Sequence, residues 1–184
     1  MTELATTLVL GGARSGKSAF AERLVADSGL VPIYLATATA DDDEMKARIA
    51  HHRAQRGQSG QSGQGWTTIE EPLALVDALT REATHGRAVL VDCLTLWLSN
   101  LMLAGRDPEV EARRLTRFLG VARYPVVFVS NEVGLGLVPD TPLGRRFRDA
   151  QGRLNQIMAA AVPQVVFIAA GLPLWLKRSS IQEN

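Results

Sequence analysis

The chain has 184 residues, of which 46% are apolar and 21% are charged. This length and composition predict one globular domain that spans residues 1–184. Twenty lysines and arginines against nineteen acidic residues give a net charge of +1, which argues against a bulk surface for nucleic acid or an anionic membrane. The single cysteine, Cys93, excludes an internal disulfide and a metal site built from several cysteines.

The ends and the apolar stretches of the chain bear on its location. Glu3 lies in an N-terminus that lacks the basic segment of a secretory signal peptide. The longest apolar stretches, residues 94–103 and 165–176, are too short or too interrupted by polar residues, glycine and proline to span a bilayer. We therefore expect a protein of the reducing cytoplasm.

Apolar segments typical of strands alternate along the chain with longer segments of helical periodicity. The predicted strands cover residues 6–10, 31–36, 66–69, 88–91, 125–129, 165–169 and 174–177. The predicted helices cover residues 17–28, 41–56, 72–84, 94–103, 108–122 and 142–162. This alternation predicts an α/β fold, a mostly parallel sheet with helices on both faces. Residues 57–65, with the sequence GQSGQSGQG, offer no apolar side chain to bury and predict a flexible surface loop.

Ligands of such folds bind beyond the carboxyl ends of the strands. The segments that follow these ends are residues 11–18, 37–42, 92–94 and 130–138. We therefore expect these four segments to share one crevice.

The first of these segments, GGARSGKS, matches the pattern G-x-x-x-x-G-K-[ST] between a strand and a helix. Glycines let backbone N–H groups turn toward phosphate oxygens, and the helix N-terminus adds partial positive charge. Lys17 places a cation on the β- and γ-phosphates, and the Ser18 hydroxyl can ligate Mg²⁺. The motif predicts a P-loop NTPase-like domain, with Arg14 either a phosphate contact or a solvated turn residue. The predicted phosphate-binding residues are Gly11, Gly12, Ala13, Arg14, Ser15, Gly16, Lys17 and Ser18.

The second motif is the apolar segment VLVD, which ends in the carboxylate of Asp92. An apolar strand that ends in aspartate can deliver this carboxylate to Mg²⁺, directly or through water. Together the two motifs indicate a magnesium–nucleotide site, which fits a kinase, a switch or an ATPase.

Two adjacent histidines lie on the predicted helix 41–56. His52 falls on the same helical face as Met45 and Ile49, whereas His51 is rotated by about 100° toward a polar side that carries arginine. Neighbouring cations lower the pKa of an imidazole and stabilise charge on a phosphate, so His51 is either a nucleophile at phosphorus or an inert surface residue. We interpret His85 as structural.

Six segments occur in a specific order: GGARSGKS, Ala36-Thr37-Ala38, DDDEMKARIAHHR, VDCLTLWLSNL, SNEVGLGLVP and GRRFRDAQGRLNQ. Together they resemble the bifunctional adenosylcobinamide kinase / adenosylcobinamide-phosphate guanylyltransferase family of cobalamin biosynthesis. The resemblance extends from residue 8 to about residue 177. It implies phosphorylation of adenosylcobinamide by ATP or GTP, then transfer of GMP from GTP through a covalent GMP–histidine, giving adenosylcobinamide-GDP and pyrophosphate.

The resemblance also implies roles for individual residues. It assigns the covalent GMP to His51, the metal to Ser18 and Asp92, and a homotrimeric assembly to the protein. Besides the phosphate loop, it assigns nucleotide contacts to Ala36, Thr37, Ala38, His52, Arg53, Ala54, Gln55, Glu70 and Asp92. Two departures are that some relatives carry glutamate at the position of Asp92, and that the loop 57–65 is longer and richer in Gln, Ser and Gly than expected.

Two further groups and two other function classes stay open. Glu132 either orients the corrinoid or Mg²⁺ or belongs to a structural turn. Four arginines of the last long helix form either a solvated face, supported by Asp149 four residues after Arg145, or a contact with substrate phosphate: Arg145, Arg146, Arg148 and Arg153. The alternatives are a small-molecule P-loop kinase without guanylyl transfer and a nucleotide-gated regulatory module, against which the absence of an Asn-Lys-x-Asp motif argues.

Overall fold

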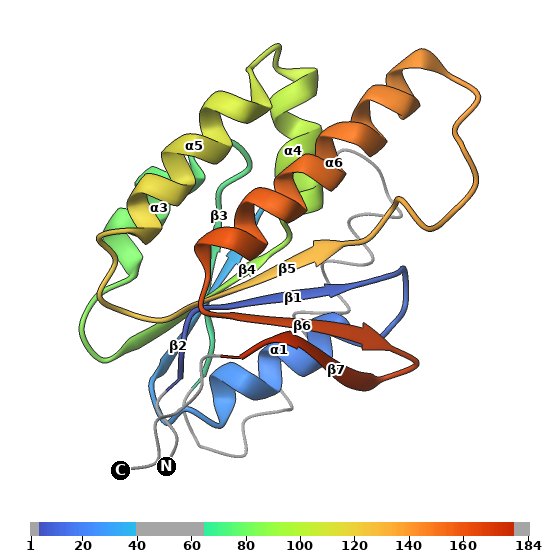
Figure 1. Cartoon of the computed structure of the whole chain (residues 1–184). Coiled ribbons are helices and arrows are strands. Elements are labelled where there is room, and N and C mark those ends of the chain that lie inside the picture. The colour runs from blue at the N-terminus through green and yellow to red at the C-terminus, as the bar shows by residue number, and fades with distance from the viewer. Residues whose placement is uncertain (1–3, 40–64, 179–184) are drawn as a thin grey trace.

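A computed structural model of the chain describes residues 4–39 and 65–178. Its strands form one seven-stranded sheet with the order β3-β2-β4-β5-β1-β6-β7 (Figure 1). Neighbouring strands pair in parallel, except that β7 runs antiparallel to β6. The mostly parallel sheet predicted from the alternation is therefore confirmed. The strands are β1 (Thr7–Gly11), β2 (Val31–Ala36), β3 (Thr67–Glu70), β4 (Arg87–Asp92), β5 (Val126–Asn131), β6 (Gln164–Ala169) and β7 (Leu172–Lys177).

The helices cover both faces of this sheet, as predicted (Figure 1). One face carries α1 (Lys17–Ala26), which packs on β1, β4 and β5. The other face carries a thicker layer, in which α5 packs against the three other helices. The helices of that layer are α3 (Leu75–Glu82), α4 (Leu94–Leu103), α5 (Pro108–Leu119) and α6 (Pro142–Ala161). None of the helices in the described ranges has the length and apolar character needed to cross a membrane.

Each central strand supplies side chains to two cores, because successive residues of a strand point to opposite faces. In β4, Val89 and Val91 pack under the four-helix layer, whereas Leu90 packs toward α1. In β5, Phe128 joins the first core and Val129 the second. This double burial explains why the strands appear in the sequence as continuous apolar runs.

Some predicted boundaries shift by a few residues, and local hydrogen bonds account for one of them. The predicted helix 72–84 begins only at Leu75, because Glu71 Oε1 first accepts hydrogen bonds from Leu73 N (3.0 Å) and Ala74 N (2.8 Å). At the other end of the chain, β7 begins at Leu172, two residues before the prediction. The predicted helix 41–56 and the loop 57–65 lie outside the described residues.

Candidate functional site

The phosphate loop connects β1 to α1 at the carboxyl edge of the sheet. Gly16, the N-cap of α1, has φ 92° and makes no side-chain capping bond within the described chain, so the first N–H groups of α1 are available to an anion. Lys17 Nζ donates to Gly12 O at 3.0 Å, which places the ammonium over the loop. A Cβ atom added to Gly11 would lie 2.5 Å from Ser15 Oγ and 2.7 Å from Ile168 O, so this position requires glycine.

The turn between β6 and β7 supports the phosphate loop from outside. Gly171 N donates to Ser15 O at 2.9 Å, and a Cβ atom on Gly16 would lie 3.3 Å from Gly171 Cα. The Ser15 hydroxyl is buried and has no hydrogen-bond partner within the described residues. A phosphate oxygen could accept a hydrogen bond from this hydroxyl, so the loop fits a phosphate-bearing ligand.

Asp92 lies at the carboxyl end of β4, where Ala36 of β2 is its register partner. The hydroxyl of Tyr34 donates to Asp92 Oδ2 at 3.1 Å, and Tyr34 itself is buried. The sequence analysis missed Tyr34. A signal was present, since Tyr34 and Ala36 share one face of a strand by their spacing, but only the pairing of β2 with β4 places that face beside Asp92. The hydroxyl of Ser18 and the carboxylate of Asp92 are hard oxygen donors of the kind that Mg²⁺ prefers.

Thr37 and Cys93 lock together the ends of β2 and β4. Thr37 Oγ1 donates to Cys93 O at 2.7 Å and accepts from Cys93 N at 2.8 Å, while Asn100 Nδ2 donates to Thr37 O at 2.8 Å. These bonds occupy the Thr37 side chain, so a ligand at residues 36–38 would meet mainly backbone. Burial, with the negative charge of Asp92 as a second cause, raises the pKa of Cys93 to about 12. Its thiol is therefore neutral at physiological pH and acts as a packing group.

The structure brings several of the predicted site residues to one edge of the sheet. Ala36 is in register with Glu70 on one side and with Asp92 on the other, and Gly11 is in register with Asn131. The phosphate loop opens at the same carboxyl edge (Figure 1). Arg14 in that loop is exposed and has φ 55°. The predicted contacts that lie outside the described residues are His51, His52, Arg53, Ala54 and Gln55.

The segment after β5 begins in this site and then leaves it. Glu132 N donates to Gly11 O at 3.0 Å, which ties the segment to the phosphate loop. Glu132 Oε1 accepts from Gly134 N at 2.6 Å, so its carboxylate makes the structural turn that was one of the two alternatives. Arg145 donates to the carbonyls of Pro139 (3.0 Å) and Asp140 (2.8 Å). No ion pair of the described residues joins Arg145 to Asp149, and Arg145 stabilises this loop instead.

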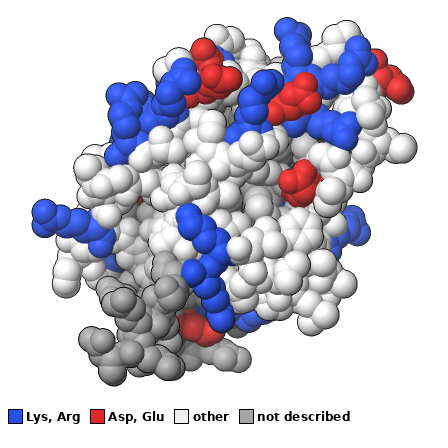
Figure 2. Space-filling model, in the orientation of Figure 1, with Lys and Arg blue, Asp and Glu red and all other residues white. Residues whose placement is uncertain are grey.

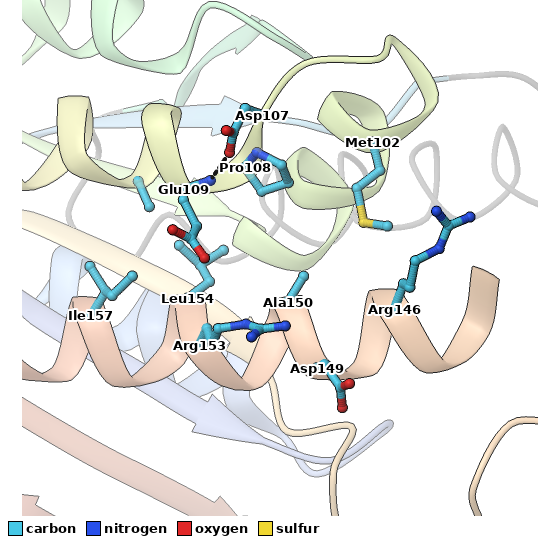
Figure 3. A pocket seen from close by; sticks show the side chains of 11 residues that line it. Met102, Asp107, Pro108, Glu109, Arg146, Asp149, Ala150, Arg153, Leu154 and Ile157 are labelled. Carbon is cyan, nitrogen blue, oxygen red and sulfur yellow. Dashed lines mark hydrogen bonds between the residues drawn. The ribbon is translucent and has the colours of Figure 1, made fainter. Parts of the chain in front are cut away.

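Arg146 and Arg153 face a different place. They line a cavity of about 440 Å³ between α6 and the junction of α4 and α5 (Figure 3). Met102, Ala150 and Leu154 form part of its wall, and no residue of the phosphate loop lines it. The two arginines therefore approach the α4–α5 junction and not the phosphate-binding edge.

Comparison with known proteins identifies the family to which this sequence is similar. Residues 7–176 match the family model described as cobinamide kinase / cobinamide phosphate guanyltransferase. A bifunctional adenosylcobalamin biosynthesis protein, CobP of Pseudomonas aeruginosa, is 51% identical over 172 residues, which cover 92% of this chain and 96% of that protein. The bifunctional adenosylcobalamin biosynthesis protein CobU of Escherichia coli is 38% identical, over 92% of this chain and 98% of that protein.

Solved structures that resemble the chain support the fold alone, because their sequences are distant. The flagellar accessory protein FlaH of Methanocaldococcus jannaschii has a TM-score of 0.56 at 12% identity, over 95% of this chain and 79% of that chain. A protein of Pyrococcus horikoshii OT3 has a TM-score of 0.55 at 10% identity, over 97% of this chain and 88% of that chain.

Proposed function

This chain belongs to the cobinamide kinase / cobinamide phosphate guanyltransferase family, and from that premise we propose that it catalyses both reactions. It phosphorylates adenosylcobinamide with ATP or GTP and then transfers GMP from GTP to the new phosphate. The products are adenosylcobinamide-GDP and pyrophosphate. The observation that carries this proposal is the phosphate loop after β1, where Gly11 admits no side chain, together with Asp92 at the carboxyl end of β4, which β5 separates from β1.

In the kinase step, the residues of the loop hold the triphosphate and orient its γ-phosphorus. The N–H groups at the start of α1 and the Lys17 ammonium bind the phosphate oxygens. The oxygen of the cobinamide hydroxyl attacks the γ-phosphorus, the bond from that phosphorus to the bridging oxygen breaks, and the nucleoside diphosphate leaves. The hydroxyl proton passes to water. Ser18 and Asp92 would hold Mg²⁺, which when bound neutralises charge on the phosphates.

In the guanylyl step, His51 attacks the α-phosphorus of GTP and pyrophosphate leaves. An oxygen of the cobinamide phosphate then attacks the phosphorus of the GMP–histidine, and the imidazole is released. A neutral imidazole is the required nucleophile. We assign the guanine nucleotide contacts to His52, Arg53, Ala54, Gln55 and Glu70, together with the backbone of residues 36–38.

We also propose a homotrimer of the cytoplasm. Support for a subunit contact comes from edge strand β7, where Leu172, Leu174 and Leu176 are 71%, 60% and 58% exposed on one face of the strand. The buried free thiol of Cys93 and the use of nucleoside triphosphates fit the cytoplasm. Light scattering after size exclusion measures the assembly, and a monomeric mass would contradict it.

The function is tested by incubation with α-labelled GTP and Mg²⁺, followed by mass mapping of the protein. We expect one GMP adduct on His51. His51→Ala should bind GTP, form no adduct and still phosphorylate cobinamide, because phosphoryl transfer needs no enzyme nucleophile. His52→Ala removes the neighbouring imidazole, to which we assign a nucleotide contact, and it should keep some adduct formation because His52 is not the nucleophile. Cobinamide kinase turnover without any adduct in the unmodified protein would favour a P-loop kinase without guanylyl transfer.

A further inference from the structure

The loop between β5 and α6 exposes an unusual set of large apolar side chains. Leu135 is 81% exposed, Leu137 96%, Val138 63%, and Leu143 at the start of α6 51%. Figure 1 shows this loop extending outward from the carboxyl edge of the sheet, on the side where the phosphate loop also lies. Exposed apolar side chains gathered in one place mark a surface that binds something.

Hydrogen bonds hold this loop in a defined shape. Gly134 N donates to Glu132 Oε1 at 2.6 Å, and Arg148 Nη2 donates to Gly134 O at 2.6 Å. At the far end, Arg145 donates to the carbonyls of Pro139 and Asp140. The apolar side chains therefore stand on a backbone fixed at both ends, and binding to them costs little ordering of the loop.

The loop is continuous with the phosphate-binding edge. Asn131 is in register with Gly11, and Glu132 N donates to Gly11 O at 3.0 Å. A substrate hydroxyl that reaches the γ-phosphate must come to this edge. The rest of a large macrocycle cannot enter between packed strands, so it must lie on the rim beside the place of reaction.

The charge distribution favours an uncharged, apolar occupant for the loop. Between Asn131 and Pro142 the ionisable residues are Glu132, bonded to Gly134 N, and Asp140. In the view of Figure 2, lysines and arginines lie over the helices α5 and α6 and at several other places on this face. The loop thus offers leucine and valine to an apolar face, while the guanidinium groups of Arg145 and Arg148 are bonded to its backbone carbonyls.

We propose that Leu135, Leu137 and Val138 form the platform on which the corrinoid ring of the substrate packs. This inference rests on the proposed function, and it adds the surface that recognises the large part of the substrate. The side chains contact the ring and take no part in phosphoryl or guanylyl transfer. They set the affinity for cobinamide and leave the reaction with GTP alone unchanged.

The test is the double variant Leu135→Ser/Leu137→Ser, compared with the control variant Leu103→Ser/Val121→Ser. Leu103 and Val121 are each 77% exposed and lie outside the loop, so the control removes similar apolar surface elsewhere. Equilibrium dialysis with cobinamide should show about tenfold to hundredfold weaker binding for the loop variant only. Its yield of GMP adduct from GTP, measured without corrinoid, should equal that of the unmodified protein.

Three results would overturn the platform. Unchanged cobinamide affinity of a loop variant that forms the adduct normally would place the ring elsewhere. A fall in the mass of the assembly, with unchanged cobinamide affinity, would make the loop a contact between copies of the chain. If the unmodified protein neither binds cobinamide nor forms the adduct, the proposed function fails and the platform fails with it.

Discussion

In the described part of the chain, the two faces of the sheet are covered to different depths, and the phosphate loop at the carboxyl edge leads into the helix of the thinly covered face. Within residues 4–39 and 65–178, one face carries α1, whereas the other carries α3, α4, α5 and α6. Strand β4 serves both, because Val89 and Val91 pack under the thick layer while Leu90 packs toward α1, and the alternation of the strand places Asp92 on the same face as Leu90. The N-terminus of α1 follows the phosphate loop directly. We therefore expect substitutions in the core under the thick layer to change mainly stability, and substitutions at the phosphate loop to change mainly activity.

Removal of the Lys17 ammonium from the phosphate loop should give the largest effect on activity. Lys17→Ala should lower both half-reactions by at least about 10²–10³-fold, because Lys17 carries the positive charge that the motif places on the β- and γ-phosphates. The free energy of unfolding should change by about 1 kcal/mol for the loss of the hydrogen bond from Lys17 Nζ to Gly12 O. Radiolabelled turnover and thermal melts measure the two effects.

Arg23→Ala is the matched control for this variant. Arg23 is an exposed cation of the same helix, over the ring of Phe20 at 5.9 Å. Its removal should leave both half-reactions near normal. Normal guanylylation by Lys17→Ala would refute the single shared site.

A substitution in the core under the thick layer should instead lower stability and leave activity unchanged. Leu115 of α5 is fully buried, and Leu115→Ala should lower the free energy of unfolding by about 2–5 kcal/mol through lost apolar contact and a cavity. The activity of the molecules that remain folded should not change. Denaturant titrations and turnover at low temperature measure both, and Leu115→Met, which conserves volume, is the control. A stable but inactive Leu115→Ala would show that the outer layer also shapes the site.

The sequence alone predicted the parts of this molecule that depend on local patterns. The phosphate loop follows from glycine and lysine spacing, and the buried strands follow from apolar runs such as residues 88–91. The sequence alone did not predict contacts that depend on which strands become neighbours in the sheet. The hydrogen bond from Tyr34 to Asp92 requires β2 and β4 to pair in one register, and the support of Ser15 by Gly171 joins residues far apart in the chain.

The start of α3 and the direction of β7 also depend on contacts that the sequence pattern does not show. Helical periodicity predicted a start at Pro72, but the Glu71 carboxylate forms a turn with residues 73 and 74 first. The strand after residue 169 was predicted without its direction, which the tight turn at Ala170 and Gly171 makes antiparallel. Side-chain bonds and positive φ values of this kind are set by competition between local structures, which periodicity does not describe.

We expect the smallest effect from the hydrogen bond between Tyr34 and Asp92. The Tyr34 hydroxyl donates to Asp92 Oδ2 at 3.1 Å and so orients the carboxylate. Tyr34→Phe removes this hydrogen bond and keeps the ring that lies edge-on to Trp66. We expect the Mg²⁺ concentration for half-maximal turnover to rise about three- to tenfold, with turnover at saturating Mg²⁺ nearly unchanged. Tyr124→Phe alters the other tyrosine of the chain, whose ring packs on His85, and should leave the Mg²⁺ curve in place. If the curves of the unmodified protein and both variants coincide, Tyr34 acts only in packing, and the orientation of Asp92 comes from the backbone bonds between residues 37 and 93.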